Sequence, residues 1–281
     1  MTEIDYSSID YNNKDKYKLS SIITGDNLLF ALTRLADKKI IKLKEISNLK
    51  ENFFLDSDYT YDLFKKNKLF HKNIECVSTA FLSGEFTIVP KGIISKDLKK
   101  THNNLLHSIK QYLDDYTIQK SDIVNIDAHN FFPFPIALKN IVSGNYPNFK
   151  IYHANDPLVC QANKIINKKD FILVNFHEYI LQTIVYRAGK FVQTNVYDIK
   201  TKDDILYYIL LNLKNTGIPL NMAHIYLSGR VQKESSIYKL LFEHIKNIHF
   251  VDNVERTDFS NVFLGKPKHL FFDIYSLSKC E

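Results

Sequence analysis

Glycine spacing is the first feature of this 281-residue chain that bears on chemistry. Nucleotide-binding loops bring backbone N–H groups close to phosphate through clustered glycines, two or three of them within about six positions. The chain has eight glycines, and the closest pair, Gly84 and Gly92, is eight residues apart. The sequence therefore excludes enzymes that use a Rossmann fingerprint, a P-loop or a kinase glycine-rich loop.

Side chains that bind metals or act as nucleophiles also lack catalytic spacing. The pairs His102/His107 and His244/His249 are five residues apart, whereas two metal ligands on one helix face are about four apart. The three cysteines form no CxxC motif, and their odd number does not suit a disulfide framework. No G-x-S-x-G or H-E-x-x-H motif occurs. These patterns do not support a hydrolase or a metal site.

The composition indicates a folded protein with a core, because 45% of the residues are hydrophobic and 24% are charged. The formal net charge of +6 comes from lysine, since only four of the 37 basic residues are arginines. Nucleic-acid sites favour arginine for bidentate contacts, so this composition argues against a nucleic-acid partner. The N-terminus is polar, and no apolar run approaches the ~18 residues of a membrane span. We expect a cytoplasmic protein that does not enter membranes.

The apolar pattern stops at about Lys168 and then restarts, which predicts two lobes, 16–168 and 169–281, after a mobile arm at 1–15. The first lobe opens with three strand-like segments joined by turns. Its expected elements are strands at 18–24, 28–34 and 39–46, a helix at 61–70, a strand pair at 75–82 and 86–89, a helix from Ser95, a strand at 123–128, a helix at 134–142, a strand at 149–153 and a helix at 156–167. The phenylalanines of FFPFP at 131–135 are expected to plug a strand–helix interface, with an exposed adhesive patch as the alternative.

The second lobe repeats this order of elements. Its expected elements are strands at 171–176, 179–187 and 191–198, a helix at 201–215, a strand at 223–227, a helix at 235–245 and a strand at 248–251. Each half is thus a three-stranded meander followed by alternating helices and strands. This repeat predicts an α/β protein with two related lobes and a cleft between them, where ligands usually bind.

Two segments carry a resemblance to a known superfamily. FILVNFHEYILQTIVYRAGKFV at 171–192 looks like the first strands of the second lobe in actin-like ATPases, which include heat-shock chaperones, sugar kinases and pilus-assembly ATPases. IYLSGRVQKES at 225–235 resembles their adenosine segment. Nearly the whole chain also resembles a bacterial family of unknown function, at GEFTIVPKGII, IYLSGRV, SSIYKLL and the terminal CE. The resemblance implies an actin-like ATPase architecture of two ribonuclease H-like lobes and assigns no activity.

The departures from the superfamily pattern concern nucleotide binding. Actin-like ATPases end the first strand of each lobe in D-x-G, where the carboxylate holds the water shell of magnesium and the glycine admits phosphate. The matching stretch of the first lobe reads Thr24-Gly25-Asp26, so its carboxylate falls in the turn. In the second lobe Asn175 stands where the Asp would be, and His177 stands in the glycine region. All three phosphate and adenosine elements are altered.

At the adenosine segment, the usual glycine pair is reduced to Ser228-Gly229, before Arg230. A structural role is the alternative at every position, because turns favour Asn and strand-to-helix turns need a flexible residue. The candidate cleft residues of this degenerate nucleotide site are Thr24, Gly25, Asp26, Asn175, His177, Ser228, Gly229 and Arg230. No catalytic or metal-binding residue is assigned.

These patterns favour a non-catalytic actin-like protein that serves as a binding, scaffold or regulatory module. We expect a protein partner and no cofactor. One alternative is a nucleotide-binding phosphotransferase or ATPase that uses ATP and magnesium with unorthodox ligands, Asp26, Asp127 and Asp198. A second alternative is an RNA- or ribosome-associated protein that uses the lysine-rich segment around 91–100.

Overall fold

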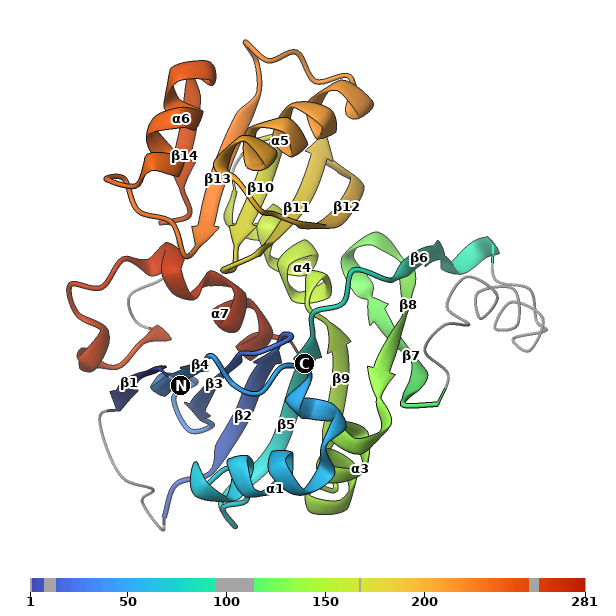
Figure 1. Ribbon diagram of the computed structural model, residues 1–281, viewed down its shortest axis with the longest axis vertical. Coiled ribbons are helices and arrows are strands. Elements are labelled where there is room, and N and C mark those ends of the chain that lie inside the picture. Colours follow the sequence, from blue (N-terminus) through green and yellow to red (C-terminus); the bar gives the residue numbers. More distant parts are fainter. Residues whose placement is uncertain (1, 8–13, 94–113, 167, 253–257, 281) are drawn as a thin grey trace. The chain divides into compact units, whose positions relative to one another are not determined.

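A computed structural model describes residues 2–7, 14–93, 114–166, 168–252 and 258–280 (Figure 1). The chain forms two compact units. The first unit comprises Met1–Asp156, Glu255–Leu264 and Leu277–Glu281, and the second comprises Pro157–Val254 and Gly265–Ser276. This division differs from the expected boundary near 168, because two C-terminal segments pack with the first unit. Among the described helices, none is both long and apolar enough to cross a membrane.

A six-stranded sheet is the centre of the first unit, in the order β1-β4-β3-β2-β5-β9. Its meander consists of β2 (Tyr17–Ile23), β3 (Leu28–Arg34) and β4 (Ile40–Ser47), and β5 (Ile74–Phe81) and β9 (Phe149–His153) continue it parallel to β2. The remaining strand, β1 (Thr2–Ser7), pairs antiparallel with β4. Part of the segment expected as a mobile arm is therefore a strand.

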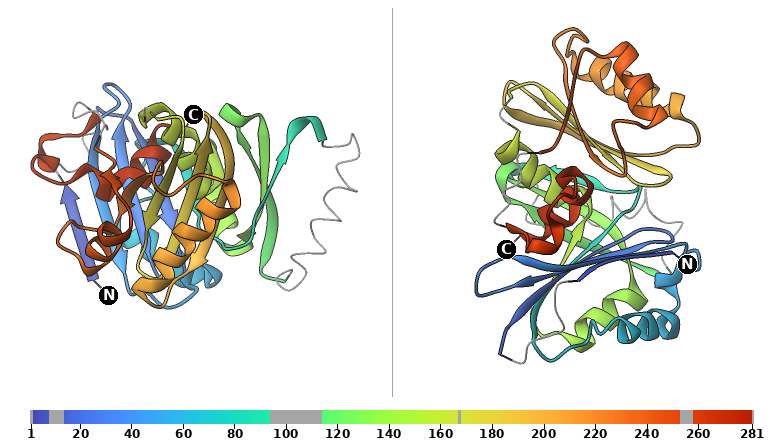
Figure 2. Two further views of the ribbon diagram at one scale, coloured as in Figure 1. Left: turned by 90° about the horizontal axis from the view of Figure 1, so that it is seen from above. Right: turned by 90° about the vertical axis from the view of Figure 1, so that its left-hand side faces the viewer.

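One face of this sheet is covered by helices, as Figure 2 shows. They are α1 (Ser57–Lys66), preceded by the short η1 (Phe53–Leu55), and α3 (Ile136–Asn145). Aromatic side chains fill the space between the layers, and Phe30, Phe53 and Phe64 are among those that are fully buried. Burial of large apolar side chains of this kind is the main force that holds a sheet and its helices together.

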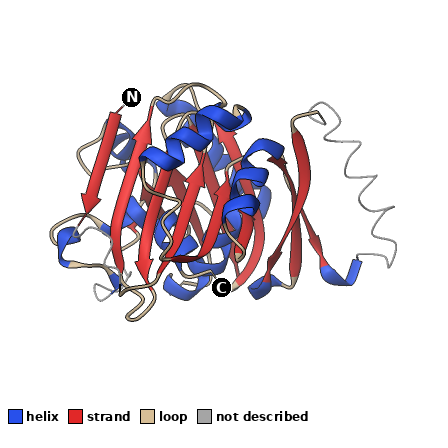
Figure 3. Cartoon of the chain, turned by 90° about the horizontal axis from the view of Figure 1, so that it is seen from below, coloured by secondary structure: helices blue, strands red, loops and turns tan. Residues whose placement is uncertain are grey.

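A separate three-stranded antiparallel sheet in the first unit consists of β6 (Thr87–Pro90), β8 (Ala128–Pro135) and β7 (Tyr116–Ile123), with η2 (Lys91–Ile93) and η4 (Val124–Ile126) at its turns. Figure 3 shows it apart from the larger sheet. The sequence predicts a strand at 123–128, which is wrong, because η4 lies there between β7 and β8. The helix predicted at 134–142 is present as α3, although Phe134 and Pro135 still belong to β8. Pro133 is tolerated in β8 because β6 pairs only with residues 128–131, so the proline removes no bond to β6.

The position of β8 also decides how FFPFP packs. Phe132 and Phe134 are fully buried and Phe131 nearly so, which fits a packing role and contradicts an exposed adhesive patch. The segments at 75–82 and 86–89 do form strands, but they belong to different sheets and do not pair with one another. The helix predicted from Ser95 lies outside the described residues.

The second unit contains a five-stranded sheet in the order β12-β11-β10-β13-β14. Its antiparallel meander consists of β10 (Phe171–Phe176), β11 (Ile180–Arg187) and β12 (Lys190–Asp198), and β13 (His224–Gly229) and β14 (Asn247–Phe250) run parallel to β10. Two helices, α5 (Lys202–Thr216) and α6 (Ser236–His244), lie on one face (Figure 2). Most of α4 (Asn155–Ile165), all of η7 (Lys268–Phe271) and most of α7 (Phe272–Ser278) also belong to the second unit, whereas η6 (Asn261–Phe263) belongs to the first.

A capping box begins α5. The backbone N–H of Asp204 bonds to Thr201 Oγ1, and the Asp204 carboxylate accepts from the backbone N–H of Thr201. Because N-cap hydroxyls satisfy otherwise unpaired helix donors, we expect Thr201→Ala to lower the free energy of unfolding by about 1 kcal/mol. Urea unfolding measures the change. Lys200→Ala, which keeps the backbone N–H that donates to the Asp204 carboxylate and changes only an exposed side chain, is the control, and an equal loss in both variants would contradict the prediction.

Candidate functional site

The sequence places a polar side chain, Asn175, in the otherwise apolar strand β10. In register beside it are Gln182 on β11 and Ser228 on β13. All three residues are fully buried. Residues opposite one another on neighbouring strands point to the same face, so the fold brings these three side chains together.

Hydrogen bonds join the three residues to His177. Asn175 Nδ2 donates to Gln182 Oε1 over 2.8 Å, and Ser228 Oγ donates to Asn175 Oδ1 over 2.8 Å. His177 Nε2 lies 2.8 Å from Gln182 Oε1 and 3.2 Å from Asn175 Nδ2. Donation from His177 to Gln182 requires the proton on Nε2. We call Asn175, His177, Gln182 and Ser228 the amide cluster.

The amide cluster is neutral when His177 is neutral, and the polar groups of Asn175 already contact protein. An amide oxygen that accepts from a serine does not supply the negative charge that binds a hydrated magnesium ion. This arrangement therefore lacks the carboxylate that magnesium–nucleotide binding would use at the end of β10. The sequence-level alternative for Asn175, a turn residue, is wrong, because Asn175 lies inside a strand.

Position 229 requires glycine, because β13 approaches β10 too closely there to leave room for a side chain. Its φ is +75°, and a Cβ there would lie 2.2 Å from Phe176 O, 2.8 Å from Phe176 N and 2.9 Å from Asn175 Oδ1. The next residue, Arg230, donates its backbone N–H to Phe176 O over 2.9 Å. The geometry of Gly229 thus follows from contact between β13 and β10. The guanidinium of Arg230 lies 3.4 Å from the Glu178 carboxylate, at the surface.

In the first unit, Thr24, Gly25 and Asp26 form the turn between β2 and β3. The carbonyl oxygens of Gly25 and Asp26 accept from the backbone N–H groups of Asn52 and Leu49, both over 2.9 Å. A Cβ at Gly25 would meet nothing within 4 Å, so no close approach requires glycine at this position. The structure thus groups three predicted residues in the first unit and five in the second.

The acids named for an unorthodox nucleotide site lie apart along the chain. Asp127 follows η4 with a φ of +49° and lies 3.5 Å from Lys91, and Asp198 is exposed at the end of β12. Asp26 lies in the turn after β2. In the part of the chain that the structure describes, no three acidic, histidine or cysteine residues form a group that could hold a metal ion.

Sequence reasoning missed a buried polar group in the first unit. The Asp156 carboxylate accepts from Ser121 Oγ at 2.5 Å, Asn130 Nδ2 at 2.7 Å and the backbone N–H of His153 at 2.9 Å. Burial raises the pKa of Asp156 to about 6, although these three hydrogen bonds act in the opposite direction. The sequence predicts Asp156 at the start of the helix at 156–167, and no local pattern links it to β7 and β8.

His153 lies beside this carboxyl group in a neutral environment. Burial lowers the pKa of His153 to about 4. Its Nδ1 accepts from the backbone N–H of Asn155 over 3.2 Å, and its Nε2 lies 2.9 Å from Ser83 O. A ring nitrogen that accepts a hydrogen bond carries no proton, so these contacts favour the neutral imidazole.

The two meander-based sheets define a protein of the actin-like ATPase fold class. A crystal structure from Bacteroides thetaiotaomicron, described as a protein with actin-like ATPase fold and unknown function, superposes with a TM-score of 0.76 and 14% identity over 98% of this chain and 100% of that one. A type IV pilus biogenesis complex, PilM–PilN, superposes with a TM-score of 0.57 and 12% identity over 93% of this chain and 97% of that one. The predicted fold class is confirmed.

The chain belongs to the family described as "Protein of unknown function (DUF3822)", which it matches over residues 6–248. The predicted resemblance to an actin-like family without assigned activity is thereby confirmed. Among proteins with curated functions, none matches the sequence.

Proposed function

We propose that this protein is a non-catalytic member of the actin-like class that acts as a binding module for another protein and needs neither ATP nor magnesium. The observation that carries the proposal is the amide cluster. Asn175 is fully buried, and its Oδ1 and Nδ2 atoms are bonded to Ser228 and Gln182. Replacing a solvated carboxylate with a bonded, neutral amide removes the group on which metal-assisted phosphoryl transfer depends.

A protein partner fits this class of structure better than a nucleic acid. PilM, whose structure superposes with a TM-score of 0.57, occurs in a complex with the protein PilN. The basic residues of the present chain are mostly lysine, which does not provide the planar forks typical of base recognition. A fold of this type hosts several functions, so the proposal rests on the site and takes only its partner class from the relative.

Isothermal titration of the full chain with ATP and ADP, with and without magnesium, tests the proposal. We expect no heat of binding at millimolar nucleotide. Micromolar binding that needs magnesium would overturn the proposal and favour a phosphotransferase. A magnesium-dependent ATPase activity that disappears in Asn175→Ala or Asp26→Ala would overturn it equally. Thermal stabilisation by nucleotide provides an independent measurement, because a ligand that binds the native state raises its stability.

Restoring the carboxylate at position 175 should destabilise the protein without creating an ATPase. In Asn175→Asp, the donor to Gln182 is lost and a buried negative charge faces the Gln182 oxygen. We expect the free energy of unfolding at pH 8 to fall by about 3 kcal/mol. The loss should be smaller at pH 4, because burial raises the pKa of the new carboxyl and its protonated form is neutral and donates.

Asn221→Asp is the matched control for this substitution. Asn221 is exposed in the same unit, so the same chemical change should leave the free energy of unfolding within about 0.5 kcal/mol of the wild type. Urea unfolding of both variants at pH 4 and pH 8 gives the comparison. Equal losses in the two variants, or a gain of nucleotide hydrolysis in Asn175→Asp, would contradict the prediction.

A further inference from the structure

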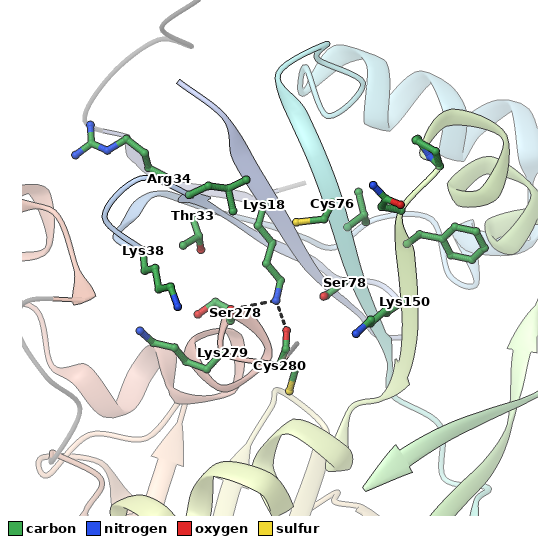
Figure 4. Close-up of a pocket in the computed structure, with 15 residues that line it drawn as sticks. Lys18, Thr33, Arg34, Lys38, Cys76, Ser78, Lys150, Ser278, Lys279 and Cys280 are labelled. Atoms are coloured by element: carbon green, nitrogen blue, oxygen red, sulfur yellow. Dashed lines mark hydrogen bonds between the residues drawn. The ribbon is translucent and has the colours of Figure 1, made fainter. Parts of the chain in front are cut away.

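The first unit contains a cavity of about 660 Å³ that lies outside the candidate site described above. Strands β2, β3, β5 and β9 line it, together with the C-terminal segment Ser278–Cys280, as Figure 4 shows. Its volume lies within the range of about 300–1,000 Å³ that is typical of small-molecule sites.

Positive charge dominates the lining. Five cations line the cavity: Lys18, Arg34, Lys38, Lys150 and Lys279. Among the lining residues that the structure describes, none is Asp or Glu. In Figure 4 the amino group of Lys18 points toward Ser278 and Cys280, to which dashed lines join it. A concave surface with a single sign of charge focuses its field on a ligand of opposite charge.

Arg34 and Lys279 form salt bridges with acids that lie outside the lining, Asp15 and Asp37 for the former and Asp258 for the latter. Arg34 Nη2 lies 2.7 Å from Asp37, and Lys279 Nζ lies 2.7 Å from Asp258. Lys18 Nζ donates to the main-chain oxygen of Ser278 over 3.1 Å and to that of Cys280. These carbonyl acceptors hold the ammonium group in place, but they carry no formal charge to neutralise it.

The hydroxyl group of Thr33 independently indicates that the cavity suits a ligand with a hydrogen-bond acceptor. Its side chain lines the cavity from β3, directly opposite Lys18 on β2, and the residue is only 6% exposed. The buried Thr33 Oγ1 has no hydrogen-bond partner in the described structure. A buried hydroxyl without a partner is unfavourable, and an acceptor oxygen placed in the cavity would satisfy it.

Part of the lining is apolar. Leu35, Val77, Pro147 and Phe149 contribute hydrocarbon surface to the same cavity. A ligand that matches both surfaces has an anionic head for the cations and a hydrophobic body for these side chains. An inorganic ion would use only the first surface, and a neutral lipid or alcohol would use only the second.

We propose that this cavity is a binding site for a small organic anion, with a carboxylate or phosphate head beside Lys18, Lys150 and Thr33 and an apolar body against Val77 and Phe149. The site is independent of the non-catalytic role proposed above and lies entirely within the first unit. The Thr33 hydroxyl donates a hydrogen bond to the anionic head. Lys150, which is exposed, supplies a positive charge from the side of the cavity that faces solvent.

Fluorescence titration of the full chain with 1-anilinonaphthalene-8-sulfonate, an aromatic organic anion, tests the site. We expect saturable binding that octanoate or octyl phosphate displaces, and octanol should be at least about tenfold less effective. The ratio between octanoate and octyl phosphate identifies the preferred head group. Absence of saturable binding, or equal displacement by octanol, would overturn the proposal.

Two variants locate the binding within the cavity. Lys150→Glu should weaken probe binding about tenfold, whereas Lys120→Glu, an equally exposed lysine on β7 outside the lining, should change it less than about twofold. Equal effects of the two charge reversals would show nonspecific attraction and overturn the site.

Thr33→Val distinguishes a ligand-binding role from a structural one. Valine has nearly the shape of threonine and removes the unpartnered hydroxyl, so the midpoint of thermal unfolding should stay the same or rise. Probe affinity should fall about fivefold in the same variant, since the anionic head loses a donor. Unchanged affinity in Thr33→Val would contradict the placement of the head group.

Discussion

We expect Gly229→Ala to lower the free energy of unfolding by at least about 3 kcal/mol. The added Cβ would lie 2.2 Å from Phe176 O, a backbone atom that cannot move without distorting β10. The positive φ of +75° adds strain for any residue with a side chain. Urea unfolding followed by circular dichroism measures the loss.

Gly189→Ala separates the two causes. Gly189 has almost the same φ, +74°, but a Cβ there would meet nothing within 4 Å. This variant should therefore lose only the conformational part, about 1–2 kcal/mol. Equal losses at positions 189 and 229 would mean that the contact with β10 relaxes freely, and the assignment of Gly229 to close strand approach would be wrong.

The second large effect concerns the pH dependence of stability and involves Asp156 and His153. The raised pKa of Asp156, about 6, gives stability that is present below pH 4 and is lost as the pH rises through 6. The lowered pKa of His153, about 4, acts in the opposite direction, since its stability is present above pH 6.5 and is lost as the pH falls through 4. Between pH 4 and 6 the two contributions oppose one another in the wild type.

Asp156→Asn removes the titrating carboxyl group and leaves the contribution of His153 to the pH dependence of stability. Relative to the wild type, the free energy of unfolding should then rise with pH between 4 and 6, by about 3 kcal/mol in total, because the opposing contribution of Asp156 is gone. His153→Gln should give the opposite slope from pH 4 to 6. Urea unfolding at half-unit pH intervals measures both slopes, and parallel curves for the wild type and the variants would contradict the assignment.

Sequence periodicity predicted the parts of the fold in which neighbours along the chain are neighbours in space. The meander at 171–198 and the capped helix α5 follow from alternation, turns and the Thr201 signal, which are local features. The strand β8 was missed because its prolines were assigned to the start of the helix that follows, α3, which does begin at Ile136. Pro133 is compatible with the strand because β6 pairs only with residues 128–131. Long-range packing, such as the return of 277–281 to the first unit, leaves no local pattern.

The candidate site was predictable to a similar degree. Resemblance to a superfamily identified Asn175 and Ser228, and the structure joins them by a hydrogen bond. Gln182 was not identified, although a polar residue in the apolar segment ILQTIV is a signal for a buried partner. Its role depends on the β10–β11 register, and Asp156 depends on contacts with β7 and β8, so neither follows from spacing alone.

The bond from Lys18 to the main chain of Cys280 spans 262 residues of sequence. During synthesis, Lys18 leaves the ribosome long before its partner Cys280. We therefore expect the sheet of the first unit to form around a hydrated Lys18, and the wall formed by Ser278–Cys280 to close only once the chain has been made beyond Cys280. The cavity beside Lys18 thus takes its final form after the strands that line it.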